Sequence, residues 1–357
     1  MEAEPRRHKG GLQEKIFYIL ALSAFFSIIC YTIFLFHGNG SFMRLPFVPQ
    51  GALERNRTTS RKIMEHVWTT HTSDVSHKTT SRHLDVCPDT PPTLVGPLLV
   101  EFETKRTLES VRNHVGFSLH QGGRYKPPNC IAKQKVAIII PFRNRYEHLN
   151  HWLYYVHPIL MHQQLDYGVY IINQEGDGVF NRAKLMNIGF VEALREYDYE
   201  CFAFADVDLV PIDDRNLYRC SEHPRHLSVA IDKFNYVLSS VTAFGGVSLL
   251  SEEQFLKVNG FSNTFWGWGG EDDDLYNRII FRGMSISRPD AKIAKYKMIK
   301  HKRDLHNEVN PKNAIKAKET AINIDTDGLN SLNYTVKEIL KDKMYTFITV
   351  DVQAPPV

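Results

Sequence analysis

The chain has 357 residues, with 43 Lys and Arg against 40 Asp and Glu, and its formal net charge is +3. That length allows one large catalytic domain with additional segments. The nearly balanced charge, and the lack of a basic stripe with interleaved aromatic residues, argue against nucleic acid as a partner.

Residues 16–36 form an uninterrupted stretch without a charged side chain. A helix that spans a bilayer needs about 20 such residues. The stretch is too long and too aromatic for the core of a cleaved signal peptide. Positive charges on its N-terminal side place that end in the cytosol: Arg6, Arg7, Lys9 and Lys15. We therefore predict a cytoplasmic tail at 1–15 and a single-pass type II anchor at 16–36.

Residues 37–89 are polar and biased toward Ser, Thr and His, so they cannot bury enough apolar surface to fold alone. We predict a luminal stem there and a catalytic domain over residues 90–357. Patterns for N-glycosylation, which matter only on the luminal side, begin at three positions: Asn39, Asn56 and Asn333.

Cysteine usage agrees with an oxidising compartment. Cys30 lies inside the predicted anchor, which leaves Cys87, Cys130, Cys201 and Cys220. Four cysteines outside the cytosol suggest two disulfides, and three pairings are possible. The absence of a CxxC spacing argues against a zinc site.

The domain opens with alternating strand and helix patterns. Continuous β-branched or apolar runs alternate with stretches of helical period: strands at 135–140, 167–173 and 201–210, and helices at 147–161 and 181–197. This order predicts an α/β fold with a doubly wound, mostly parallel sheet, whose ligands bind beyond the carboxyl ends of the strands. No G-x-G-x-x-G or Walker loop is present, which disfavours a dehydrogenase or a P-loop enzyme.

Asp206, Val207 and Asp208 close the third predicted strand, where alternation points both carboxylates the same way. Hard oxygen ligands there suit Mn²⁺ or Mg²⁺ on a diphosphate. Met298 and His301 follow a strand predicted at 291–296 and could face the same ion. Their softer donor atoms favour Mn²⁺ over Mg²⁺.

Basic residues follow the first strand and begin the second helix. Arg143 and Arg145 present guanidinium groups that suit phosphate oxygens, and Phe142 could contact a nucleobase. Arg182 begins a helix, where a phosphate is also favoured by the backbone. The alternative for the first pair is a charged surface turn.

Residues 265–274 interleave two tryptophans with glycines and end in four consecutive carboxylates. Indole faces stack on sugar rings, and adjacent carboxylates raise one another's pKa, as a general base near neutral pH requires. The alternative is an acidic loop that caps a helix beginning near Leu275. The aromatic and glycine half of the motif favours a sugar site. Residues 306–318 could be an ordinary loop or a lid.

Together these motifs resemble the β-1,4-galactosyltransferase family, Golgi type II enzymes with the GT-A fold. The resemblance extends from about residue 87 to residue 350 and rests on linked motifs in one order: 141–145, 180–184, 206–208, 244–247, 266–274 and 298–301.

The resemblance implies a Mn²⁺-dependent, inverting transfer of galactose from UDP-Gal to terminal GlcNAc, with Asp272 as the base. It implies Asp208, Met298 and His301 as metal ligands. The implied nucleotide-sugar contacts are Pro141, Phe142, Arg143, Arg145, Arg182, Asp206, Val207, Asp208, Gly246, Trp268 and Glu271. The implied acceptor contacts are Trp268, Gly270, Glu271, Asp272 and Asp273. It also implies disulfides Cys87–Cys130 and Cys201–Cys220, and a mobile loop at about 299–316.

The sequence departs from the family at the donor pocket. Ala243 stands where vertebrate galactosyltransferases usually have a Tyr that crowds the 2-position of the donor sugar. A small residue there accompanies N-acetylgalactosaminyl transfer, so UDP-GalNAc stays an alternative donor to UDP-Gal. Residues 239–242 lack the family's aromatic residue, and Ala314 replaces an aromatic residue of the loop. We therefore do not expect α-lactalbumin to bind.

Two other functions fit these motifs less well. A non-catalytic glycan-binding surface protein could use the same fold, but binding alone needs neither metal ligands nor a base. A glycoside hydrolase needs two carboxylates at a defined separation across the scissile bond and leaves the D-x-D motif unexplained.

Overall fold

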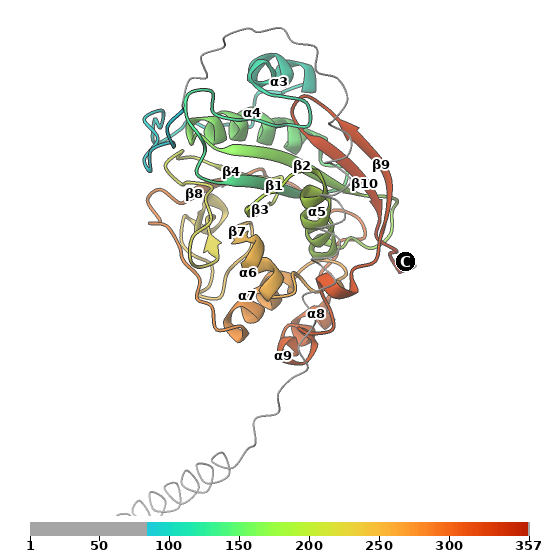
Figure 1. The fold of residues 1–357 in the computed structure, drawn as a ribbon. Coiled ribbons are helices and arrows are strands. Elements are labelled where there is room, and N and C mark those ends of the chain that lie inside the picture. Colours follow the sequence, from blue (N-terminus) through green and yellow to red (C-terminus); the bar gives the residue numbers. More distant parts are fainter. Residues whose placement is uncertain (1–83, 356–357) are drawn as a thin grey trace, which may run out of the picture. The chain divides into compact units, whose positions relative to one another are not determined.

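A seven-stranded sheet with strand order β5-β7-β3-β1-β2-β10-β9 forms the centre of the fold (Figure 1). The computed structural model describes residues 84–355. Four neighbouring strands are parallel: β3 Cys201–Ala205, β1 Lys135–Phe142, β2 Asp166–Gln174 and β10 Thr346–Asp351. The remaining three, each antiparallel to a neighbour, are β7 Val247–Ser251, β5 Arg225–His226 and β9 Thr335–Lys341. The predicted mostly parallel α/β sheet is confirmed.

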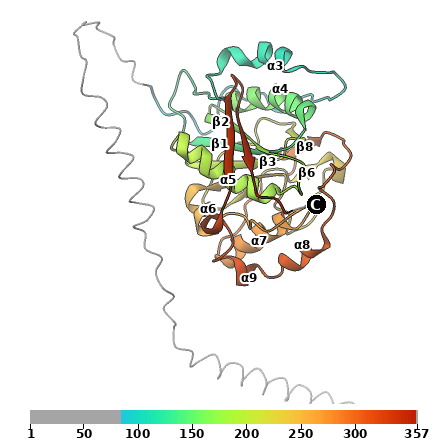
Figure 2. The same ribbon diagram turned by 90° about the vertical axis from the view of Figure 1, so that its right-hand side faces the viewer.

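Helices cover both faces of this sheet (Figures 1 and 2). In β1, Val136, Ile138 and Ile140 pack in one core, and Ala137 and Ile139 in the other. The first core contains side chains of α3 Leu108–Val115 and α4 Tyr146–His162. The second contains side chains of α5 Arg182–Glu196, α6 Glu252–Lys257 and α7 Glu271–Phe281. Because both faces are buried, the strands are continuously apolar, as a parallel sheet requires.

Helix α5 packs against the sheet without an intervening side chain at Gly189. A Cβ atom on that residue would lie 2.2 Å from Cγ2 of Ile139 on β1. A glycine is therefore needed for this approach. The close packing brings the N-terminus of α5 to the carboxyl ends of β1 and β2.

A three-stranded sheet of order β4-β8-β6 lies beside the central sheet, with strands β4 Leu209–Pro211, β8 Lys295–Met298 and β6 Ala230–Ile231. The prediction of one strand over 201–210 is therefore wrong. β3 ends at Ala205, and the chain turns, with the Leu209 amide donating to the Asp206 carbonyl over 3.3 Å. It then pairs with β8 instead of the central sheet. The two aspartates lie in this turn, so strand alternation does not set their direction.

The strand predicted at 291–296 lies further along, at Lys295–Met298. The Asp290 carbonyl accepts hydrogen bonds from the amides of Ile293 and Ala294, so this stretch forms a turn before the strand begins. Met298 consequently ends β8. The other helical elements are η1 Gly116–Ser118, η2 Asp232–Phe234, α8 Pro311–Lys316, α9 Thr320–Asn323 and η3 Leu329–Ser331.

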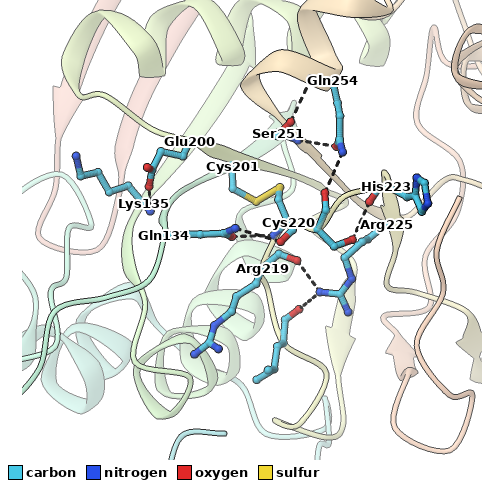
Figure 3. Close-up of a disulfide and its surroundings, with 12 residues drawn as sticks. Gln134, Lys135, Glu200, Cys201, Arg219, Cys220, His223, Arg225, Ser251 and Gln254 are labelled. Carbon is cyan, nitrogen blue, oxygen red and sulfur yellow. Dashed lines mark hydrogen bonds between the residues drawn. A yellow bond between two sulfur atoms is a disulfide. The ribbon is translucent and has the colours of Figure 1, made fainter. Parts of the chain in front are cut away.

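Two disulfides join Cys87 to Cys130 and Cys201 to Cys220, which confirms the implied pairing. The side-chain amide of Gln134 makes two hydrogen bonds beside the second disulfide. It accepts from the Cys220 amide over 2.9 Å and donates to the Cys220 carbonyl over 3.1 Å (Figure 3). The first bond lies beside a bridge between Val86 and Ile131. Folded contacts therefore begin a few residues before the boundary expected at residue 89.

Within residues 84–355 no helix is long and apolar enough to cross a membrane. The predicted anchor at 16–36 and two of the glycosylation positions, Asn39 and Asn56, lie outside the described residues. The third, Asn333, is exposed.

Candidate functional site

A cavity of about 810 Å³ opens at the carboxyl ends of the parallel strands. Ten residues that the sequence assigned to the site line it: Pro141, Arg143, Arg145, Arg182, Asp206, Val207, Asp208, Trp268, Met298 and His301. These residues come from segments as far apart as 141–145 and 298–301. The topology therefore gathers the nucleotide and metal motifs on one wall.

His301 and Asp208 meet directly in this cavity. Nε2 of His301 lies 2.8 Å from Oδ2 of Asp208, and Nδ1 lies 2.7 Å from the Lys302 carbonyl. Since both partners are acceptors, the protonated ring can donate from both nitrogens, whereas the neutral ring with its hydrogen on Nδ1 leaves the Nε2 lone pair for a cation. The hydrogen bond to Asp208 raises the pKa of His301. An outer partner that fixes the tautomer in this way is typical of a metal-binding histidine.

These residues fit Mn²⁺ by the chemistry of their donor atoms: a carboxylate oxygen, an imidazole nitrogen and a thioether sulfur. The Met298 amide donates to Oδ1 of Asp232 over 2.9 Å, which holds this end of β8 at the cavity. Across residues 84–355, three or more His, Cys, Asp or Glu side chains do not cluster as a metal site would. Of the three predicted ligands, only Asp208 and His301 are of those types, because the third ligand is the thioether of Met298.

Arg182 connects the metal motif to the acidic helix. It is the first residue of α5, whose N-cap Asn181 accepts from the Lys184 amide over 2.8 Å. Nε of Arg182 lies 2.7 Å from Oδ1 of Asp206, and Nη1 lies 2.7 Å from Oδ1 of Asp272 and 3.3 Å from Oε1 of Glu271. One guanidinium group therefore joins two motifs that the sequence shows only separately.

The four carboxylates form the first turn of α7, which begins at Glu271, so the alternative of an acidic loop that caps a helix beginning near Leu275 is wrong. Gly270 precedes the helix with a φ of 90°, which favours glycine. Acidic side chains in a first turn interact favourably with the helix dipole. The carboxylates do not share one environment, because Asp274 is buried against Arg278 at 2.6 Å whereas Asp273 is exposed.

Burial and mutual repulsion shift the titration of these acids. Burial, followed by the charge of Asp272, raises the pKa of Glu271 to about 7, although Arg182 opposes the shift. Burial also raises the pKa of Asp206 to about 6 against the opposing effect of Arg182. Burial, and then Asp272, raises the pKa of Asp273. Oε2 of Glu271 is buried without a hydrogen-bond partner among the described residues, which adds to the cost of ionising this carboxyl group.

The Asp272 carboxylate rests against the backbone of Gly245. A Cβ atom at that position would lie 2.1 Å from Oδ2 of Asp272. The Phe244-Gly245-Gly246 motif therefore provides a surface on which the acid sits. Gly246 has a φ of 76°, and its carbonyl accepts from the Asp206 amide over 2.9 Å. The same short segment thus contacts both acidic motifs.

Residues 299–316 lie against the cavity walls. Arg145 pairs with Asp304 at 2.6 Å, and Arg143 donates to the Leu305 carbonyl over 3.1 Å. The Trp268 amide donates to the Glu308 carbonyl over 2.8 Å. The sequence left open an ordinary loop or a lid for residues 306–318, and the structure places helix α8 within that stretch. That these residues move as a lid stays a prediction. Both arginines of the first loop hold this segment in the structure.

Some predicted residues do not reach the cavity. Phe142 is buried and packs edge-on against Tyr146 and Phe347, with ring centroids 5.1 and 5.6 Å away. Six others lie outside the cavity lining, around the acidic helix and the loop that faces it: Ala243, Gly246, Gly270, Glu271, Asp272 and Asp273.

Several cavity residues were missed in the sequence: His148, Phe180, Asp232, Lys233, Arg303 and Asp304. Phe180 reaches the cavity, as Trp268 does, and Arg143 lies over the Phe180 ring at 5.0 Å. Its position directly before Asn181 and Arg182 is the feature of the sequence that could have indicated a place in the cavity. Arg303 lies over the Trp268 ring at 4.5 Å, a contact that no local pattern indicates.

Comparison with known proteins agrees with this geometry. Residues 87–221 match the family described as the N-terminal region of glycosyl transferase group 7, and residues 225–302 match the one described as the N-terminal domain of galactosyltransferase. The chain is 57% identical over 277 residues to β-1,4-galactosyltransferase 1 of Bos taurus, covering 78% of this chain and 69% of the relative. The chain belongs to the β-1,4-galactosyltransferase family.

Other relatives support the same assignment. The chain is 56% identical over 270 residues to β-1,4-galactosyltransferase 2 of Homo sapiens, covering 75% of this chain and 72% of the relative. A solved structure of a mutant Drosophila β-1,4-galactosyltransferase 7, in complex with manganese, UDP-Gal and xylobiose, is similar with a TM-score of 0.53 and 28% identity. The match covers 62% of this chain and 95% of that one. This family member is therefore a glycosyltransferase with a GT-A-like α/β fold.

Proposed function

We propose that the protein is a Mn²⁺-dependent, inverting β-1,4-glycosyltransferase that transfers galactose from UDP-Gal to a terminal GlcNAc of a glycoprotein or glycolipid. The observation that carries this proposal is the set of ion pairs of Arg182. They bring Asp272, the proposed base, next to the Asp206–Asp208 turn, which lines the cavity assigned to the nucleotide sugar. The relatives' names and the ligands of the solved family structure support the same reaction.

Asp208, Met298 and His301 would hold the cation. When bound, Mn²⁺ supplies positive charge that stabilises the departing diphosphate. Asp272 takes the proton of the acceptor hydroxyl group as that oxygen attacks the anomeric carbon from the face opposite UDP. Its side chain is 36% exposed, so it can reach a bound acceptor. Residues 299–316, once closed, exclude water that would otherwise compete for the donor.

The test is a panel of UDP-sugars with a GlcNAc acceptor and Mn²⁺, in which product linkage is determined. A β-1,4-linked galactoside is the expected product, and its formation should stop when the metal is chelated. Transfer that continues without a divalent cation, or a product of retained anomeric configuration, would refute the proposal.

UDP-GalNAc is the second candidate donor, because Ala243 has only a methyl side chain and lies two positions before Gly245, which contacts Asp272. We expect the Ala243→Tyr variant to shift preference toward UDP-Gal, since the ring would crowd the 2-position of the donor sugar. The measurement is the ratio of kcat/KM for the two donors. An unchanged ratio would remove Ala243 from donor selection.

We also propose that the protein is a type II Golgi membrane protein with a luminal catalytic domain. The uncharged stretch at 16–36 and its basic N-terminal flank support this location, as do the two disulfides. Protease protection in sealed Golgi vesicles tests the orientation, because the catalytic domain should be digested only after detergent is added.

A further inference from the structure

Arg288 holds the loop that faces the acidic helix through hydrogen bonds to the backbone of that loop. Residues 239–246 form this donor loop, which contains Ala243 and Gly245. Nη2 of Arg288 donates to the carbonyls of Val241 and Ala243 over 2.9 and 2.8 Å. Val241 is 78% exposed, so protein atoms scarcely cover the loop on its outer side. The guanidinium group is therefore a main restraint on the position of these two peptide groups.

A second pair of side chains holds the carbonyl of Gly245. Nε2 of His226 and Oγ of Ser228 each lie 2.9 Å from this oxygen, and the Ser228 hydroxyl also accepts from the Val247 amide over 2.9 Å. Because a carbonyl only accepts, the His226 ring carries its hydrogen on Nε2. Its Nδ1 then accepts from Nε of Arg288, at 3.4 Å.

The backbone brings these three side chains together. The His226 amide donates to the Ser287 carbonyl over 3.0 Å, and Arg225 and Ser287 form a parallel bridge. Arg288 therefore follows directly beside β5. His226 is 2% exposed, and burial, followed by the charge of Arg288, lowers its pKa to about 4. The ring is consequently neutral at neutral pH and keeps this arrangement of donor and acceptor.

Gly245 also contacts Asp272, the proposed base. The Gly245 carbonyl is fixed by His226 and Ser228, while the position of its missing Cβ is occupied by the Asp272 carboxylate. Any movement of Gly245 would displace both the surface under Asp272 and the neighbouring Ala243. Since Ala243 has only a methyl group, the position of the loop backbone sets the space beside the donor sugar.

We propose that His226, Ser228 and Arg288 form a buttress that positions the donor loop, and that Arg288 thereby helps to select between UDP-hexose and UDP-N-acetylhexosamine donors. The inference rests on the proposed function. None of the three side chains lines the cavity, so they act as positioning residues through Ala243 and Gly245. Pockets discriminate weakly between small differences in substituent size, and a shift of the loop should therefore change the donor ratio.

The decisive variant is Arg288→Lys, which keeps the positive charge but loses the fork that reaches two carbonyls. We expect the ratio of kcat/KM for UDP-GalNAc to that for UDP-Gal to change by about fivefold, as the loss of about one hydrogen bond implies. The Mn²⁺ concentration for half-activation should not change. Arg282→Lys is the matched control, since Arg282 also donates to a backbone carbonyl, that of Lys257, which lies outside the donor loop.

His226 provides a test by rescue. The His226→Ala variant should lower kcat with both donors, because Gly245 and the resting surface of Asp272 lose their support. His226→Gln should restore most of kcat, since its amide can donate to the same carbonyl. Equal donor ratios in Arg288→Lys and the wild type would overturn the role in selection. A loss in His226→Ala that Gln does not restore would overturn the role of the His226 hydrogen bond.

Hydrogen–deuterium exchange separates a failed inference from a failed proposed function. The amides of residues 239–246 should exchange faster in Arg288→Lys than in the wild type and in Arg282→Lys, whatever the enzyme transfers. If the wild type transfers neither sugar, the proposed function fails. The exchange rates of residues 239–246 still test whether the buttress positions the loop. Unchanged exchange in Arg288→Lys would refute the buttress in either case.

Discussion

Arg182 faces three carboxylates within hydrogen-bonding distance, and this determines its charge state. Burial alone would lower the pKa of a guanidinium group, but Asp206, Asp272 and Glu271 outweigh that effect and raise the pKa of Arg182. The side chain therefore stays charged and keeps the acids close together. Without it, these carboxylates would repel one another and the two motifs would separate.

Replacing Asp272 with Asn tests the proposed base. An amide cannot accept the acceptor proton, so kcat should fall by about 100- to 10,000-fold. UDP and Mn²⁺ should still bind, because the residues proposed to hold them are unchanged. Stability should change by less than about 1 kcal/mol, since the ion pair with Arg182 is partly exposed. Isothermal titration and single-turnover rates provide the measurements.

Asp325→Asn is a matched control, because Asp325 is an exposed aspartate that also pairs with an arginine, Arg282, away from the cavity. Its turnover should equal that of the wild type. Turnover in Asp272→Asn comparable to this control would exclude Asp272 as the base.

Glu271 should make stability depend on pH. Its pKa is raised from 4.5 to about 7 in the folded protein, so folding favours the protonated carboxyl group. The free energy of unfolding should therefore fall as pH rises from about 4.5 to about 7. Glu271→Gln, which does not ionise, should make this decline smaller and leave the part that comes from Asp206, whose pKa is also raised, to about 6. Urea denaturation at several pH values measures it, with the exposed Glu253→Gln as the control. A parallel decline in Glu271→Gln and the wild type would contradict the prediction.

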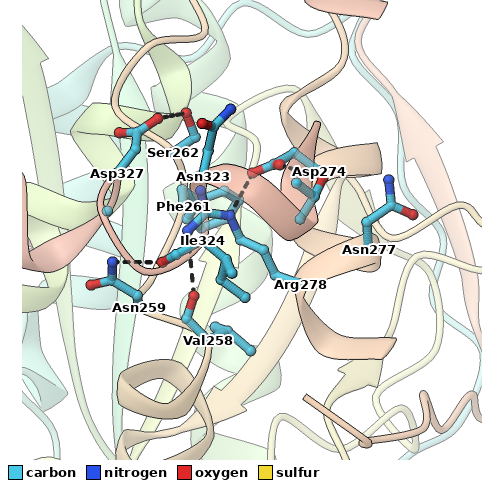
Figure 4. Close-up of polar contacts among 12 residues, drawn as sticks. Val258, Asn259, Phe261, Ser262, Asp274, Asn277, Arg278, Asn323, Ile324 and Asp327 are labelled. Carbon is cyan, nitrogen blue, oxygen red and sulfur yellow. Dashed lines mark hydrogen bonds and ion pairs between the residues drawn. The ribbon is translucent and has the colours of Figure 1, made fainter. Parts of the chain in front are cut away.

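At the scale of elements, the acidic residues in the first turn of α7 have two separate roles. Glu271 and Asp272 face Arg182, whereas Asp274 turns inward to Arg278. Arg278 also lies against the carbonyls of Val258 and Gly260, at 3.4 Å each (Figure 4). The same acidic run therefore serves both the site and the packing of its helix.

The segment after residue 316 is joined to α7 through the same buried acid. Oγ1 of Thr320 in α9 donates to Oδ1 of Asp274 over 2.7 Å. Nδ2 of Asn277 donates to the Ala317 carbonyl over 2.7 Å. These contacts fix the segment after residue 316 to α7, while residues 299–316 contact the cavity walls. Movement of residues 299–316, if they act as the proposed lid, would not require movement of α9.

Thr320→Val tests this anchor with little change in shape. Removing the hydroxyl group leaves Oδ1 of the buried Asp274 without its Thr320 partner, so we expect a loss of about 1–3 kcal/mol in the free energy of unfolding. Thr326→Val is the control, because Thr326 is exposed and its hydroxyl group bonds only the Asn323 carbonyl, at 3.3 Å. Equal denaturation midpoints for the two variants would show that the contact contributes nothing.

At the scale of the whole domain, two disulfides join segments 43 and 19 positions apart. Cross-links that close loops of this size stabilise by about 3–4 kcal/mol, chiefly by restricting the unfolded chain. We expect the Cys87→Ser/Cys130→Ser double variant to lose about this much in urea denaturation. Because neither residue lines the cavity, the kcat of the folded fraction should be unchanged. A large fall in the kcat of the fully folded variant would instead show that this disulfide affects the candidate site.

Local patterns in the sequence were enough for the main elements and for the motifs. The apolar run of β1 and the helical period of α4 depend on residues within one turn or one strand, and both elements lie within one or two residues of their predicted limits. The motifs at 206–208, 266–274 and 298–301 were likewise visible, because they combine unusual residue types over a few positions.

The tertiary structure decided how those motifs meet. Arg182 is separated from Asp272 by 90 positions, and Asp208 from His301 by 93, so no local period indicates either contact. The end of β3 at Ala205, the burial of Asp274 and the burial of Phe142 also depend on partners distant in the chain. The sequence by itself determined elements such as β1 and α4 and the chemistry available, because periodicity is local. Only the fold decided which carboxylate faces Arg182, because distant segments set that environment.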